Sequence, residues 1–182
     1  MKRHIAVSLL FCAVALVEGC ATPAITENMV PPAPVAAGRP ADPSLSDGVA
    51  VHAIAGGSET NPMWVSKVSD KDFKAALVRA LRSAGLLSAE GASPRYQLDA
   101  TLLSLEQPMF GLDLKVTCSV RYDLTDAATG KRVFGKTITT PFTATFSDSA
   151  LAVARLRIAN EGSVRKNLAE LLDELLKLRP AQ

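Results

Sequence analysis

Side chains that bind transition metals are scarce in this sequence, and their scarcity limits the sites it can hold. The 182 residues include three cysteines and two histidines. Cys12, Cys20 and His4 all lie in the first 20 residues, so only Cys118 and His52 remain in the rest of the chain. Because zinc sites usually take three or four Cys or His ligands, we predict no metal site and no cofactor. We interpret His52 as an ordinary strand residue.

The sequence also has little net charge. Its 20 Lys and Arg residues are balanced by 18 Asp and Glu residues, which gives a formal charge of +2. A protein that binds nucleic acid by electrostatics usually shows a clustered basic surface. We therefore predict no nucleic-acid partner.

Recognisable catalytic motifs are absent as well. The chain has no nucleophile elbow, phosphate-binding loop or histidine–metal helix motif. Its strand carboxylates Asp99, Glu106, Asp113 and Asp123 are predicted to face solvent, where an open sheet gives little shelter for a carboxylate pair. The sequence predicts no catalytic residue and no enzyme, and a hydrolase with an unrecognised site remains the alternative from that class.

No hydrophobic run near the N-terminus reaches the roughly 20 residues that span a bilayer. Lys2 and Arg3 precede an apolar run over 5–17, which is the layout of a secretory signal peptide, here residues 1–19. Val17-Glu18-Gly19-Cys20 follows and resembles a lipobox, although Glu18 replaces the usual small or apolar residue.

The lipobox resemblance implies cleavage after Gly19 and acylation of Cys20, so that the membrane becomes a partner through the lipid. Several acyl chains on one cysteine give stable attachment. Ala21, rather than Asp, follows the cysteine, which implies sorting to the outer membrane with the domain facing the periplasm, in preference to the inner membrane. The alternative is an ordinary signal peptide cleaved near Ala21.

Residues 20–47 are predicted to be the lipidated cysteine and a proline-rich tether. Repeated prolines prevent a helix or sheet from propagating, and they favour a semi-extended spacer. We therefore expect this segment to hold the domain tens of ångströms from the bilayer. Residues 48–182 are long enough for a single domain with one core.

Within this domain, strands are predicted over 49–55, 96–106, 112–124 and 132–146. The strand over 112–124 alternates most strictly, with its even-numbered residues, Cys118 included, on the buried face and its odd-numbered residues on the solvated face. In the strand over 132–146, Phe146 is expected on the apolar side. A turn over 126–130 joins these two strands.

Two amphipathic helices complete the prediction. The first begins after Ser69, with Asp72 as partner in a variant of the capping box, and ends at Gly85. The second covers 149–178, begins at Asp148 or Ser149, and has Gly162 as a point where it can bend. The expected fold is α+β and two-layered: a four-stranded, mostly antiparallel sheet with two helices on one face, in the order β-α-β-β-β-α.

The lipobox, the tether and this element order together resemble small envelope lipoproteins of bacteria. The similar families are the lipopolysaccharide-assembly lipoprotein, the auxiliary lipoproteins of ABC transport systems and a set of uncharacterised outer-membrane lipoproteins. The last is most similar over Tyr96–Ala100, Tyr122–Asp126 and Ala159–Gly162. The resemblance covers about residues 48–178 and brings no catalytic motif.

These features lead to one preferred function and two alternatives. We expect a non-enzymatic accessory or scaffold in outer-membrane assembly or transport, with an envelope membrane protein as partner. Trp64 and Met63 in a loop, and Arg121 on the polar strand face, are the candidate partner-binding residues, since aromatics and Met are common at interface cores. A module that binds lipid, glycan or cell wall is the first alternative, and the hydrolase is the second.

Overall fold

The computed structural model describes residues 22–32, 40–59 and 67–179. These residues form a four-stranded sheet of β1 (Val49–Ala55), β2 (Tyr96–Glu106), β3 (Leu114–Asp126) and β4 (Arg132–Ala144), in that spatial order. β1 pairs with β2 in parallel, whereas the β2–β3 and β3–β4 pairs are antiparallel. The α+β class and the mostly antiparallel sheet are therefore confirmed.

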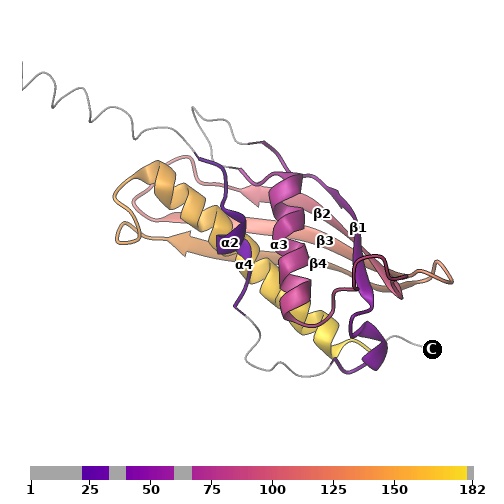
Figure 1. Ribbon diagram of the computed structural model, residues 1–182. Coiled ribbons are helices and arrows are strands. Elements are labelled where there is room, and N and C mark those ends of the chain that lie inside the picture. Colours follow the sequence, from indigo (N-terminus) through magenta and orange to yellow (C-terminus); the bar gives the residue numbers. More distant parts are fainter. Residues whose placement is uncertain (1–21, 33–39, 60–66, 180–182) are drawn as a thin grey trace, which may run out of the picture.

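Helices α3 (Asp70–Ser83) and α4 (Ala152–Lys177) lie across one face of the sheet (Figure 1). The helix start predicted at Ser69 is confirmed: the Ser69 hydroxyl accepts a hydrogen bond from the backbone N–H of Asp72 at 3.1 Å and donates one to its carboxylate at 2.7 Å. The predicted start of α4 is wrong. Leu151 precedes that helix and makes no side-chain cap.

The alternation in β3 sets which face of the sheet is buried. Its inward side chains Leu114, Val116, Cys118, Val120, Tyr122 and Leu124 are all buried. Arg121 and Asp123 lie on the opposite face. Because a one-residue slip would exchange the two faces, this burial confirms the predicted register. Leu112, expected to begin the strand on its buried face, instead lies before β3 and is exposed, and so is Phe146 beyond β4.

Gly162 lets α4 approach β4 closely. A Cβ at this position would lie 2.4 Å from the Phe142 ring. The helix is continuous through Gly162, so this glycine serves close packing and does not interrupt the helix.

A small polar network lies inside the core between α4 and the sheet. The Tyr122 hydroxyl donates to the Asn167 side-chain oxygen at 2.8 Å, and the Asn167 amide donates to the backbone oxygen of Ile138 at 2.8 Å. Burial raises the pKa of Tyr122 well above its ordinary value. Since buried polar groups are costly without partners, these hydrogen bonds explain how Tyr122 and Asn167 are accommodated.

The predicted tether is partly wrong. Thr26–Met29 form a single helical turn, α2, and Pro43–Leu45 form a 3-10 turn. Met29 and Leu45 are fully buried in the main core. Residues 22–32 and 40–47 thus belong to the folded domain, because buried apolar side chains and long-range hydrogen bonds outweigh the local effect of the prolines.

Candidate functional surfaces

The first residues that the structure describes pack along α4 through one buried carboxylate. The side chain of Glu161 is 4% exposed. Its two oxygens accept hydrogen bonds from the backbone N–H of Ile25 and from the Asn28 side chain, each at 2.8 Å. Arg157 forms an ion pair with Glu161 at 3.6 Å. Glu161 therefore fixes the N-terminal segment onto the helix.

Further contacts give the direction of this segment. Arg165 donates to the backbone oxygen of Asn28 at 2.8 Å, and Arg157 donates to the Thr22 hydroxyl. From Asn28 back to Thr22 the partners on α4 move from Arg165 through Glu161 to Arg157. The segment thus runs parallel to α4, and its upstream end points toward the N-terminus of that helix.

The exposed sheet face carries an ordered charge cluster on β3 and β4. The Arg121 guanidinium donates two hydrogen bonds to the Asp123 carboxylate, at 2.9 and 3.0 Å, and Arg132 adds a contact at 3.2 Å. The hydrogen bond from Arg121 holds the pKa of Asp123 below its usual value. A Cβ on Gly135 would lie 2.9 Å from this carboxylate, so a glycine leaves room for the cluster.

Arg121 is thus found on the open face, as predicted, and its neighbours there are polar. Ser119 and Thr139 hydrogen-bond each other across β3 and β4 at 2.7 Å, and His52 hydrogen-bonds Asp99 across β1 and β2 at 2.8 Å. Over the described residues, no helix covers this face (Figure 1). The other predicted site residues, Cys20, Met63 and Trp64, lie outside the described residues.

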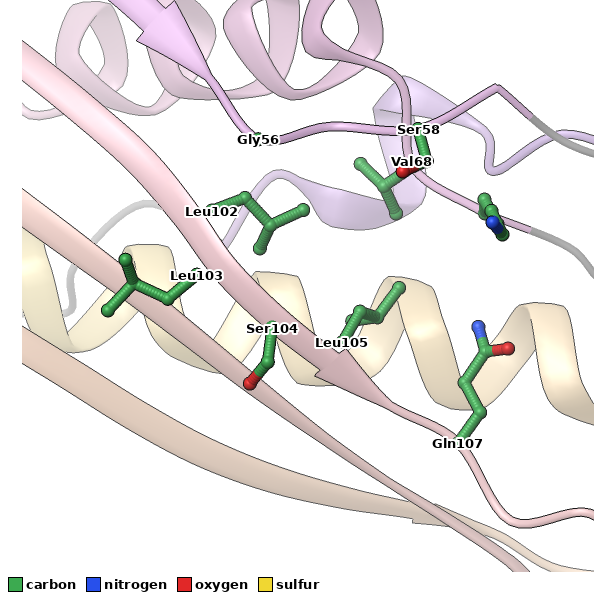
Figure 2. Close-up of a pocket in the computed structure, with 9 residues that line it drawn as sticks. Gly56, Ser58, Val68, Leu102, Leu103, Ser104, Leu105 and Gln107 are labelled. Atoms are coloured by element: carbon green, nitrogen blue, oxygen red, sulfur yellow. The ribbon is translucent and has the colours of Figure 1, made fainter.

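A pocket of about 230 Å³ opens beside the end of β2. A β-bulge between Leu102 and Ser104 changes which side chains face inward. Figure 2 shows Leu105 and Gln107 pointing toward the segment that contains Val68, whereas Ser104 points away. Ligand pockets usually span about 300–1,000 Å³, so this pocket suits only a small group.

Two further properties concern only the residues that the structure describes. No group of three or more His, Cys, Asp or Glu side chains is placed to hold a metal ion there. None of the helices in this part of the chain is long and apolar enough to cross a membrane.

Sequence reasoning missed an apolar end of the domain. Five exposed side chains come from the β2–β3 and β4–α4 loops: Met109, Phe110, Leu112, Phe146 and Leu151. The available signal was the run Met109-Phe110-Gly111-Leu112 between two strands, where turn residues are normally polar. It also missed Glu161, whose role depends on a segment more than 130 residues away.

No protein-family model and no curated protein matches this chain. Solved structures share its fold. A candidate lipoprotein from Caulobacter crescentus CB15 is 16% identical with a TM-score of 0.50, covering 73% of this chain and 90% of its own. A Xanthomonas campestris protein of the DUF330 family is 15% identical with a TM-score of 0.50, covering 74% and 88%.

A minor lipoprotein from Acinetobacter baumannii is more distant, with 10% identity, a TM-score of 0.43 and coverage of 74% and 98%. The first two structures, at 16% and 15% identity, show a common fold. The chain therefore shares the α+β fold of a candidate bacterial lipoprotein.

Proposed function

We propose that this chain is a non-enzymatic lipoprotein of the bacterial envelope, lipidated at Cys20, that serves as an accessory or scaffold for a membrane-protein partner in outer-membrane assembly or transport. The lipobox, and the fold shared with a protein described as a candidate lipoprotein, support a lipid anchor at Cys20. The observation that carries the accessory role is the bare sheet face with its ordered cluster of Arg121, Asp123 and Arg132.

A surface of this kind suits protein recognition. The guanidinium and carboxylate groups already hold one another in place, so less side-chain freedom is lost when a partner binds. Charges arranged in this way also favour one orientation of the partner over others. Trp64 and Met63 remain candidate partner contacts.

The anchor is tested by metabolic labelling with a fatty acid. Cys20→Ser should abolish the label and leave an unprocessed precursor, because the acceptor thiol is gone. The Cys118→Ser protein, which keeps Cys20, is the matched control and should label normally. Normal cleavage and release of soluble Cys20→Ser protein would remove the lipoprotein assignment.

The accessory role is tested by photocrosslinking in cells. A photoreactive residue in place of exposed Thr137, opposite Arg121 in the sheet, should capture an envelope membrane protein, and Arg121→Glu should reduce that capture several-fold. Lys74, exposed on α3, provides both the control crosslinking position and the control substitution Lys74→Glu. Capture from Lys74 but not from Thr137 would place the docking surface on the helical layer instead.

The ligand-binding alternative depends on the pocket beside β2. If the pocket bound a lipid or a glycan, filling it with Leu105→Trp would disturb function more than Arg121→Glu. The small volume of the pocket favours the accessory role.

A further inference from the structure

The apolar end defined above is unusual for a soluble surface. Five large apolar side chains of two loops are exposed to water there; the exposed fractions are 94% for Met109, 88% for Phe110, 73% for Leu112, 55% for Phe146 and 52% for Leu151. Contiguous exposed apolar patches on monomers commonly mark sites of interaction with protein or membrane.

Short contacts hold the two loops together at this end. The backbone N–H of Phe146 donates to the Asp113 carboxylate at 3.3 Å, and the Arg155 guanidinium lies 5.3 Å from the centroid of the Phe146 ring. Arg155 also donates to the backbone oxygens of Ser149 and Ala150, at 2.6 and 2.9 Å. The β2–β3 loop, the β4–α4 loop and the start of α4 therefore form one surface (Figure 1).

The chain enters the domain at the same end. Thr22 contacts Arg157 in the second turn of α4, and the segment from Asn28 to Thr22 runs toward the start of that helix. Only Ala21 separates Cys20 from Thr22 in the sequence, and each of the two residue steps spans at most about 3.6 Å. A lipid on Cys20 would therefore be joined to the domain within roughly 7 Å of Thr22, whose contact with Arg157 lies near the start of α4 and the apolar end.

We propose that the apolar end rests directly on the lipid bilayer, with its loops inserted among the headgroups and upper acyl chains. This proposal rests on the lipidation of Cys20 proposed above. The lipid supplies the occupant, because an acylated Cys20 this close to the domain brings the membrane to the apolar end. Phe, Leu and Met side chains favour that boundary. The loop carboxylates Asp113 and Asp148 already accept hydrogen bonds from backbone N–H groups.

This docking also orients the rest of the domain. β3 and β4 run away from the apolar end, and β3 has 13 residues at about 3.3 Å each. The opposite hairpin, with Ala128, therefore stands on the order of 40 Å from the bilayer. The open sheet face with Arg121 rises along the side of the domain, where a membrane protein in the same bilayer can reach it.

Fluorescence quenching by the membrane tests this orientation. Single cysteines at Phe110→Cys and Ala128→Cys are labelled with an environment-sensitive dye in the full lipidated protein, in vesicles of phosphatidylethanolamine and phosphatidylglycerol. Cys118 is buried and Cys20 carries lipid, so neither competes for the dye. Spin-labelled lipid should quench the dye at position 110 several-fold more strongly than at 128. Met109→Ser should weaken the quenching of a third probe at Leu151→Cys.

The outcomes separate the two proposals. If the protein floats with the vesicles but positions 110 and 128 are quenched equally, docking is overturned and the anchor stands. If it neither floats nor carries lipid on Cys20, both proposals fail. If the dye at position 110 is shielded without lipid and Phe110→Cys forms a disulfide-linked dimer, a second copy covers this end and the membrane-docking proposal is overturned.

Discussion

Cys118 lies on the inward face of β3, and burial raises the pKa of its thiol to about 12. An unfolded cysteine has a pKa near 8.5. Between these two values the unfolded chain releases the thiol proton while the folded chain keeps it. The free energy of unfolding therefore falls as pH rises across this window, by up to about 1.4 kcal/mol per pH unit.

Cys118→Ala should remove this part of the pH dependence and cost about 1 kcal/mol at neutral pH through the small cavity it leaves. Urea unfolding of both proteins between pH 7 and 10 measures the two effects. In the same series, native protein should resist thiol alkylation until it unfolds. Equal pH slopes for the two proteins, or rapid alkylation of the native state, would contradict the buried position of the thiol.

Gly162 provides a second test on the scale of single residues. Gly162→Ala places a methyl group against the Phe142 ring, and we expect a loss of about 1–3 kcal/mol from overpacking. The same substitution in a Phe142→Ala background should cost much less, because the opposing ring is gone. A double-mutant cycle by urea unfolding measures the difference. Equal costs in both backgrounds would mean that the contact with Phe142 does not limit this position.

At the scale of the elements, Glu161 joins the N-terminal segment to α4. Glu161→Gln keeps the shape but removes a buried charge that accepts two hydrogen bonds, and we expect a loss of about 1–3 kcal/mol. Residues 22–32 should then become more sensitive to protease and exchange their amides faster. Glu170→Gln, an exposed position on the same helix that pairs with Lys136, should change stability by less than about 0.5 kcal/mol. Unchanged protection of residues 22–32 in the Glu161→Gln protein would show that other contacts hold the segment.

At the scale of the whole molecule, the docking proposal requires the N-terminal segment to be part of the folded domain. If residues 20–47 were a free spacer, Met29 would contribute nothing to stability, but the structure buries Met29 completely. Met109, in contrast, is 94% exposed. Met29→Ala should lower the free energy of unfolding by about 2–5 kcal/mol, and Met109→Ala should change it by less than about 0.5 kcal/mol. Thermal and urea unfolding of the two variants provide the comparison. Similar small effects in both would restore the spacer interpretation.

The fold could be predicted from sequence where short-range patterns are strong. Alternation places Cys118 and Tyr122 inward in β3, and the Ser69–Asp72 pair marks the start of α3. Positive φ angles at Gly85 and Gly130 agree with the predicted helix end and turn. The ends of the strands were less predictable. Leu112 continues the alternation in sequence, but it lies before Leu114, the first residue of β3 that pairs with β4.

The candidate surfaces were predicted only in part. Arg121 was placed on the polar face by the alternation of β3. The cluster in which Arg121 and Arg132 both pair with Asp123 depends on the hairpin register and on the space left by Gly135. The apolar end was not predicted, since it joins loops that are separate in sequence.

The sequence alone determined the order of the main elements and the inward and outward faces of β3, because these depend on periodicity within a few residues. It also contains the lipobox resemblance at Cys20. Only the tertiary structure decided that residues 22–32 pack on α4 and that two apolar loops meet near the point where the chain enters. Both depend on contacts across long sequence distances, such as Asn28 with Glu161. Local proline content carries no information about such contacts, because their free energy comes from burial and hydrogen bonds formed only in the folded chain.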